Sequence, residues 1–330
     1  MKPRTFKLLK AAAIAAALLP LAGVVQAAQT LKFAHVYEVA TPYHAAALKA
    51  AELFKERTDG RYEIKVFPAS SLGKEVAINE GLSLGTVDII YTGAGFASRA
   101  YGPVAIGDFP FTLRNYKHWE AYRDSELFGE LADGYKKATS NEIMAMIYYG
   151  QRHVTANKPI LTPADMKGLK IRVPNAPSFV LFPKETGANP TPMAFSEVYL
   201  ALQQGVVDAQ ENPLPTIQFK KFYEVQSNIN LTAHITNSLV TVVSGLRLGS
   251  MSEEDRAALQ ETLQETGAMA TGEIVQAEKD LVAWFRDKGI TVNEVDRAPF
   301  MEMVKPALLS KDMPWPADVY ERLQAIEDAK

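Results

Sequence analysis

The chain has 330 residues, of which 47% are hydrophobic and 22% charged, and its formal net charge at pH 7 is -3. This composition is typical of one or two compact globular domains and excludes a disordered or fibrous chain. The absence of cysteine excludes disulfides, thiol chemistry and a lipid-carrying cysteine at a cleavage site. The sequence shows no basic patch of the kind that a nucleic-acid binder needs, so no nucleic-acid partner is expected.

Residues 1–28 are interpreted as a cleavable secretory signal peptide. Four basic residues occur within the first ten, an apolar charge-free run follows from Ala11 to Val25, and small residues end it at Val25-Gln26-Ala27. A membrane anchor is the alternative, but this run is interrupted by Pro20 and is shorter than the ~20 residues that a spanning helix needs. We therefore expect a periplasmic protein that is not embedded in the membrane, with a mature net charge of about -7 once the four basic residues are removed.

The next segment alternates strands and helices. Helix signals are clear after Thr41-Pro42, where threonine can cap and proline suits the first helical position, and Gly60 ends that helix. Such alternation predicts an α/β sheet whose ligands bind at the carboxyl ends of the strands, so the loops after Val36, Phe67 and Tyr91 should converge. The expected elements are strands 31–36, 63–67 and 88–91 and helices 42–59 and 74–84.

The pattern then restarts, which predicts a second α/β lobe joined to the first by strands. A capping box at Ser252 to Asp255 begins a helical pattern that reaches about Lys288. Helices beyond ~25 residues are unusual, and one this long could pack against both lobes. The other expected elements are strands 142–149, 169–173, 206–209 and 239–246 and helices 162–168 and 196–204.

Enzyme and cofactor motifs are nearly absent. There is no Walker A loop, G-x-S-x-G elbow or H-E-x-x-H pair, and Gly93-Ala94-Gly95 is better explained by a tight turn than by a dinucleotide site. No cofactor or metal is predicted, because the histidines lack metal-ligand spacing. His35 and His153 lie in segments that face the expected site, whereas the others are His44, His118 and His234.

Arg172 is the most informative residue. Strand alternation places it opposite Ile171 and Val173 in a segment suited to burial. A buried guanidinium needs an anionic partner, and its two parallel N–H donors match a carboxylate. That carboxylate could belong to a ligand or to the protein, and Arg152, three residues after Tyr149, poses the same question.

Groups suited to a polar solute surround these arginines. Asn175 and Asn212 offer amide donors and acceptors, and Phe195 offers a flat apolar wall. Nearby prolines would stiffen the loops and reduce the ordering cost of binding, or they only mark turns. These prolines are Pro174, Pro177, Pro190, Pro192 and Pro213.

Three segments, 166–177, 187–199 and 204–213, resemble the substrate-binding subunits of tripartite ATP-independent periplasmic (TRAP) transporters, and the likeness covers essentially the whole mature chain. It implies a two-lobed fold of the type II-like periplasmic binding protein class, with a long helix spanning both lobes. Lobe I would comprise 29–149 plus 238–277, and lobe II 150–237 plus 278–330. The implied partners are a small carboxylate solute and the small and large TRAP membrane subunits.

The resemblance also implies site roles. Arg172 would form the main salt bridge to the ligand carboxylate, with Arg152, Asn212 and Phe195 as further contacts. Glu75 and the loop of Tyr37 and Glu38 would approach from the opposite lobe.

Within this family, the resemblance is to the branch that binds sialic and other sugar acids. The members that bind sialic acid carry polar side chains where this chain has Gly93 and Phe96. A hexuronate or aldonate is the leading hypothesis, with hydroxyls donating to Glu38 and Glu75. Tyr37, Tyr91 and Phe96 keep an aromatic or aliphatic oxo or hydroxy acid open.

Two other functions remain open. A periplasmic sugar-acid lyase or isomerase would need an acid and a base flanking the ligand, for which Glu38, Glu75 and His153 are the candidates. A sensor-type binding protein would deliver its signal to a receptor instead of a transporter.

Overall fold

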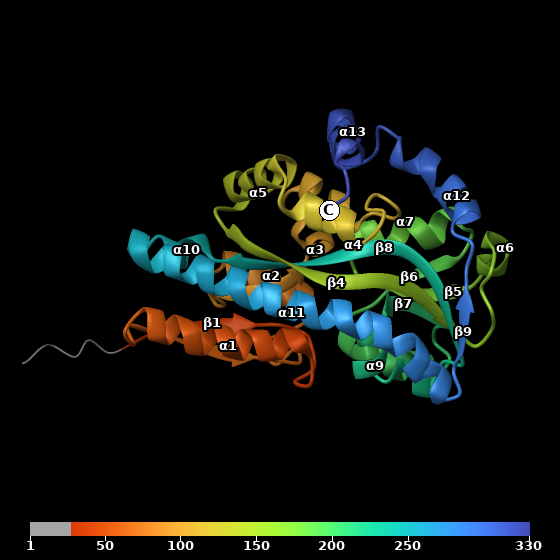
Figure 1. The fold of residues 1–330 in the computed structure, drawn as a ribbon, viewed down its shortest axis with the longest axis horizontal. Coiled ribbons are helices and arrows are strands. Elements are labelled where there is room, and N and C mark those ends of the chain that lie inside the picture. Colours follow the sequence, from red (N-terminus) through yellow and green to blue (C-terminus); the bar gives the residue numbers. More distant parts are fainter. Residues whose placement is uncertain (1–27) are drawn as a thin grey trace, which may run out of the picture.

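A computed structural model describes residues 28–330, so the predicted signal peptide lies almost entirely outside the described residues. The fold is α/β, as expected, with one nine-stranded sheet in the described part of the chain and helices packed around it (Figure 1). Among these residues no helix combines the length and the apolar composition that crossing a membrane would require.

The first half of the sheet is built from three parallel strands in the order β2-β1-β3: β1 (Gln29–Ala34), β2 (Tyr62–Phe67) and β3 (Ile89–Gly93). Helix α1 (Pro42–Arg57) follows β1, and the Thr41 hydroxyl accepts from the backbone N–H of His44 as the predicted cap. Helix α2 (Glu75–Ser83) follows β2. The loops after all three strands leave from one edge, because the strands are parallel.

The second half repeats this order as β6-β5-β7, with β5 (Lys170–Val173), β6 (Asn189–Pro192) and β7 (Ala209–Pro213) again parallel. In each half the first strand lies between the second and the third. The helices of this half are α7 (Pro177–Glu185), α8 (Val198–Gln203) and α9 (Leu214–Phe219).

Two long antiparallel strands join the halves, namely β4 (Glu142–Ala156) and β8 (Asn228–Val243). Strand β8 pairs with β3 at one end, and β4 pairs with β7 at the other, so both strands run the length of the sheet (Figure 1). Strand β9 (Thr291–Glu294) adds to β8 in parallel. The halves are thus linked by sheet hydrogen bonds.

Helix α11 (Glu253–Asp287) has 35 residues and starts at the predicted cap, where the Ser252 hydroxyl accepts from the backbone N–H of Asp255 at 3.0 Å. It packs on β4, on α1 of the first half and on α9 of the second (Figure 1). The expectation that this helix contacts both halves is therefore confirmed.

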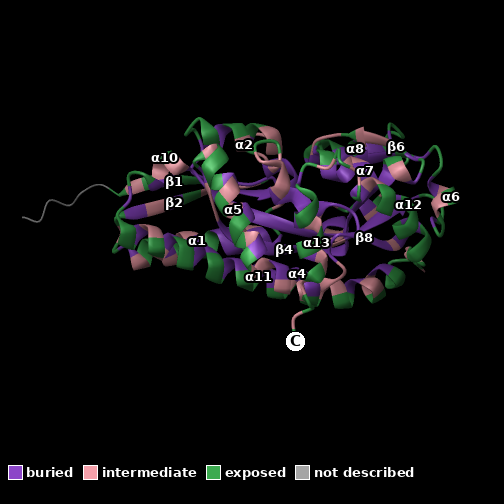
Figure 2. Cartoon of the chain, turned by 90° about the horizontal axis from the view of Figure 1, so that it is seen from above, coloured by how far each residue is buried: buried purple, intermediate pink, exposed green. Residues whose placement is uncertain are grey.

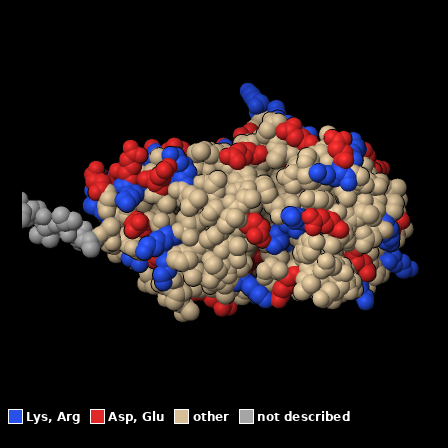
Figure 3. Space-filling view, turned by 90° about the horizontal axis from the view of Figure 1, so that it is seen from below, with Lys and Arg blue, Asp and Glu red and all other residues tan. Residues whose placement is uncertain are grey.

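The remaining helices cover the sheet and its ends. Buried residues concentrate on the strands and on the inward faces of the helices (Figure 2). On the face shown in Figure 3, acidic and basic side chains are intermixed. These helices are α3 (Ala94–Ala97), α4 (Tyr116–Arg123), α5 (Glu126–Thr139), α6 (Pro163–Met166), α10 (Gly245–Leu248), α12 (Ala298–Leu308) and α13 (Ala317–Ala325), with 3₁₀ turns at Gly102–Asp108, Phe195–Glu197 and Phe222–Glu224.

Two strand predictions were wrong in a way that matters for the predicted site residues Arg152 and Asn212. Strand β4 continues to Ala156, so Arg152 lies within the strand and not beyond its end. Strand β7 is Ala209–Pro213 and not 206–209, so Asn212 is also a strand residue. The cause is that polar side chains were taken as strand ends, whereas here their partners lie on neighbouring strands and allow burial.

Candidate functional site

A small cavity lies where the loops of the two halves meet. It brings together seven of the ten predicted site residues. These seven are spread over 175 positions of the sequence, from Tyr37 to Asn212. The lining residues are Val36, Tyr37, Glu75, Gly93, Phe96, Tyr149, Arg152, Arg172, Pro174, Phe179, Phe195, Asn212, Asn237 and Leu239.

Arg172 on β5 is buried, with 1% of its surface exposed. Its Nε and Nη2 donate to the carbonyl oxygen of Met193 at 3.0 and 2.7 Å, and its Nη1 has no hydrogen-bond partner within residues 28–330. Burial lowers the pKa of the guanidinium to about 10, against the favourable influence of Glu211 and Glu75. Arg172 therefore stays charged at neutral pH and has an N–H group still to satisfy.

Arg152 on β4 has a different environment, because its charge is met by the protein. Its Nε and Nη2 donate to the carboxylate of Glu211 on β7, Nη2 also donates to the Glu211 carbonyl at 2.7 Å, and Nη1 donates to Asn237 Oδ1 at 2.8 Å. Burial alone would raise the pKa of Glu211, but Arg152 and His234 together lower it. Of the two open possibilities for Arg152, an internal carboxylate partner is the one observed.

Glu75 enters the cavity from the first half, as the first residue of α2. The residue is partly exposed overall, but its carboxyl lies among the lining side chains, and desolvation raises its pKa to about 7 although Arg172 and Arg152 oppose the shift. Within the described residues the Glu75 carboxyl forms no ion pair.

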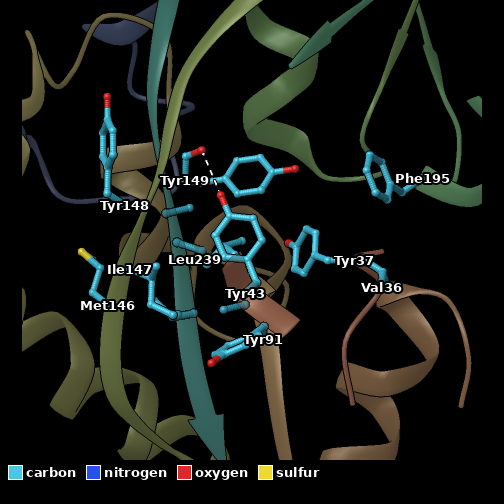
Figure 4. Packing of buried hydrophobic residues seen from close by; sticks show 14 of the residues in the cluster. Val36, Tyr37, Tyr43, Tyr91, Met146, Ile147, Tyr148, Tyr149, Phe195 and Leu239 are labelled. Carbon is cyan, nitrogen blue, oxygen red and sulfur yellow. Dashed lines mark hydrogen bonds between the residues drawn. The ribbon is translucent and has the colours of Figure 1, made fainter. Parts of the chain in front are cut away.

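Aromatic rings from both halves form one wall. The Tyr37 ring centroid is 5.6 Å from that of Tyr149 and 6.1 Å from that of Phe195, and Figure 4 shows Tyr37 between these two rings. The Phe179 ring lies 4.8 Å from the guanidinium carbon of Arg152. Asn212 is fixed in orientation, because its Nδ2 donates to Gln210 Oε1 at 2.6 Å.

Three predicted site residues lie outside the cavity lining. Tyr91 packs against Phe33 with ring centroids 4.6 Å apart, and its hydroxyl points away from the ring cluster (Figure 4). Glu38 pairs with Lys220 at 2.6 Å. Asn175 is exposed, and its Oδ1 accepts from Arg99 at 3.2 Å. Their positions follow from contacts that a single strand or loop pattern does not reveal.

The two histidines expected near the site also lie outside the lining. His35 Nδ1 accepts from the backbone N–H of Tyr37 and His153 Nδ1 from that of Ala233, at 3.2 and 3.1 Å. Burial, with a second histidine nearby in each case, lowers the pKa of both to about 3, so both are neutral. Of the acid–base candidates Glu38, Glu75 and His153, Glu75 alone reaches the cavity.

Sequence reasoning missed several lining residues, above all Asn237, Phe179 and Tyr149. Asn237 lies in the long strand β8, whose polar stretch was not predicted as a strand. Phe179 lies on α7, which was not predicted at all. Proline at the second position before Phe179, a helix-start signal, could have identified that helix.

Contacts between the halves close the cavity. Lys74 beside α2 pairs with Glu197 at 2.7 Å, and Arg99 donates to the Asn175 carbonyl at 2.7 Å. Phe96 packs with Val173 and Phe179 in a small apolar cluster. The structure therefore corresponds to a closed arrangement of the halves.

No cluster of three or more histidine, aspartate or glutamate side chains suited to a metal ion occurs in residues 28–330. The charged groups of the cavity are thus two arginines and one glutamate, backed by Glu211. This arrangement can hold a carboxylate and hydrogen-bond polar groups next to it.

Comparison with known proteins places this geometry in context. Bacterial extracellular solute-binding protein, family 7, matches residues 33–311. The sialic acid-binding periplasmic protein of Vibrio cholerae is 35% identical, over 89% of this chain and 91% of its own. The 2,3-diketo-L-gulonate-binding periplasmic protein of Escherichia coli is 31% identical, over 91% of this chain and 93% of its own.

A solved structure shares the fold. It is a TRAP periplasmic solute-binding protein from Roseobacter denitrificans with bound L-galactonate, 33% identical, with a TM-score of 0.84. The similarity covers 90% of this chain and 100% of that one.

Proposed function

We propose that the solute of this protein is a sugar acid such as a hexuronate or an aldonate. The premise is that the chain belongs to the bacterial extracellular solute-binding proteins of family 7, as a TRAP substrate-binding subunit and not an enzyme. The carboxylate of that acid binds Arg172. The single observation that carries this proposal is the buried Nη1 of Arg172, which lines the cavity without a partner among the described residues.

The physical reason is the cost of leaving a buried charge unpaired. A buried cation with an unsatisfied donor is unfavourable, and a carboxylate compensates it through a charge-assisted hydrogen bond. Arg152 contributes differently from what the sequence suggested. Arg152 lines the cavity, but its charge is already paired with Glu211. It can therefore contact the solute without needing the solute as a counter-ion.

A polyhydroxylated acid fits the rest of the lining. Glu75, Asn212 and Asn237 supply polar groups, and Tyr37 and Phe195 supply faces for the apolar side of a sugar. The relatives named above bind L-galactonate, 2,3-diketo-L-gulonate and sialic acid by name. Gly93 and Phe96 add no polar group, which favours a smaller acid than sialic acid.

The aromatic wall supports a second candidate, an aromatic or aliphatic oxo or hydroxy acid. The ring centroid of Tyr37 is 5.6 Å from that of Tyr149 and 6.1 Å from that of Phe195. The apolar chain of an acid could pack against these rings. Its carboxylate would use the same arginine.

In the proposed mechanism the halves move as lobes, 29–149 plus 238–277 and 150–237 plus 278–330. The acid first pairs with Arg172 on the second lobe, and Tyr37 and Glu75 of the first lobe contact it only on closure. The ligand shifts the population toward the closed form by its differential affinity for the two states. The TRAP membrane subunits then receive the solute from the periplasm, to which residues 1–28 direct the protein.

A thermal-shift screen tests the proposal, with hits measured by calorimetry. The panel contains aldonates, uronates, sialic acid, simple oxo and hydroxy acids, neutral sugars and amines. A ligand at 100 times its dissociation constant adds ~2.7 kcal/mol of stability, which gives a clear shift. Stabilisation by neutral sugars or amines but by no acid would refute carboxylate binding.

A further inference from the structure

The charged side chains that line the cavity differ in whether the protein itself supplies an oppositely charged partner. Three charged residues line it, namely Arg152, Arg172 and Glu75. Glu211 neutralises Arg152 from behind, through its carboxylate and its carbonyl. Within the described chain the lining therefore presents one guanidinium and one carboxyl that have no charged partner, Arg172 and Glu75.

These two groups come from opposite halves of the molecule. Arg172 is on β5, and Glu75 starts α2. Each affects the pKa of the other, they line the same cavity, and the described residues form no ion pair within 4.0 Å between them. A solute whose carboxylate binds Arg172 extends toward the wall that carries Glu75.

The groups around Glu75 do not remove its charge. Arg172 and Arg152 face it from β5 and β4, and the phenols of Tyr37 and Tyr149 lie close enough to be influenced by it. At the rim, Lys74 is engaged by Glu197 at 2.7 Å. No second free cation is therefore available in the described lining to receive a second carboxylate.

We infer that Glu75 is a specificity-determining residue, which makes the site accept monocarboxylates and reject dicarboxylates of the same length by charge repulsion. The inference rests on the proposed function and narrows its substrate class. It separates aldonates and uronates from aldarates, which carry a carboxylate at both ends.

The expected selectivity is large. At an effective dielectric constant of about 20, two carboxylates about 6 Å apart repel each other enough to weaken binding roughly 100-fold. A hydroxyl at the same place instead donates a hydrogen bond to Glu75.

The test compares two matched pairs of acids by calorimetry at pH 8: galactonate with galactarate, and glucuronate with glucarate. Wild-type protein should bind the monoacid of at least one pair about 100-fold more tightly than its diacid. Glu75→Gln keeps the shape of the side chain and removes its charge, so the ratio should fall at least 10-fold. Glu80→Gln, an exposed position on the same helix, is the matched control and should keep the wild-type ratio.

A second measurement varies the pH. Lowering the pH from 8 to 6 protonates Glu75, whose pKa is about 7. In the wild type this should lower the ratio of monoacid affinity to diacid affinity. Of the groups near the lining, Arg172 with a pKa of about 10 and Tyr149 with a pKa of about 12 do not titrate in this range. Buried Asp108, whose carboxylate accepts from the backbone N–H groups of Gly95 and Ser238, has a pKa of about 6 and does titrate, so the same pH comparison on Glu75→Gln separates its contribution from that of Glu75.

The two proposals fail in distinguishable ways. If wild-type protein binds a monoacid but neither Glu75→Gln nor the lower pH changes the ratio, the charge-selection role is wrong and sugar-acid binding stands. If wild-type protein binds none of the aldonates and uronates of the thermal-shift panel, sugar-acid binding is wrong, and the selection role falls with it.

Discussion

Arg152 and Glu211 lie on the neighbouring strands β4 and β7 and form a buried ion pair, in which two guanidinium nitrogens meet the carboxylate and Nη2 also meets the Glu211 carbonyl. Both residues are at most 2% exposed. The pair fixes Arg152 in the wall of the cavity, where the Nη1 atom of Arg172 is buried without a hydrogen-bond partner among the described residues.

Glu211→Gln should therefore destabilise the protein strongly. It keeps the side-chain shape but leaves Arg152 charged, buried and without its counter-ion, and breaking a buried pair from one side costs about 3–5 kcal/mol. The loss is measured as the free energy of unfolding in urea. Glu130→Gln breaks the exposed pair with Arg322 and should change it by less than about 1 kcal/mol. Equal effects of the two substitutions would contradict this view of the pair.

Arg172→Ala should abolish detectable solute binding, and Arg172→Lys should weaken it by ~2 kcal/mol or more, about 30-fold, because an ammonium lacks the planar fork. Calorimetry with the best acid of the screen measures both. Arg123→Lys, at a surface pair with Asp124, is the control and should bind normally. Near-normal affinity of both Arg172 variants would show that the carboxylate binds elsewhere.

Gly95→Ala should hinder closure of the two halves. A Cβ at Gly95 on α3 would lie 2.5 Å from the Ser178 hydroxyl and 2.9 Å from the Phe179 ring on α7 of the other half. Separation of the halves relieves the clash, so the expected result is solute affinity lowered by about 10-fold or more, about 1.4 kcal/mol, with little change in stability without solute.

The matched control for this test is Gly129→Ala on α5, where a Cβ meets nothing within 4 Å. It should leave solute affinity unchanged. Wild-type affinity in Gly95→Ala would mean that the contact between α3 and α7 is not part of the binding-competent form.

Glu278 on α11 should make stability depend on pH. Its carboxyl group accepts from the backbone N–H of Gln151 at 2.6 Å and from the Tyr148 hydroxyl at 2.8 Å, beside the shift in the β4–β8 register at Gly150, and burial raises its pKa from 4.5 to about 7. The folded protein thus holds a proton that the unfolded chain releases. The resulting stabilisation is present below pH ~4.5 and is lost as the pH rises through ~7.

The measurement is unfolding free energy between pH 5 and 8 for wild type and Glu278→Gln. The variant should gain on the wild type as the pH rises, since glutamine has no proton to lose. Glu273→Gln, exposed on the same helix, should run parallel to the wild type. A constant difference between Glu278→Gln and the wild type across this range would exclude the titration of Glu278 as the cause.

The sequence by itself determined the features that depend on neighbours along the chain. The caps at Thr41 and Ser252 fixed the starts of α1 and α11, because a capping hydroxyl satisfies a backbone N–H two or three residues away. Alternation in β5 placed Arg172 on its own face of the strand, and the resemblance over the motifs around it indicated the family.

Only the tertiary structure decided which charges are already paired. Glu211 reaches Arg152 across 59 positions, and Asn237 reaches it across 85, through pairing of β4 with β7 and β8. The same pairing buried polar residues within strands that the sequence pattern ended too early. Strand partners and buried ion pairs are set by contacts between distant segments, and local periodicity carries no information about them.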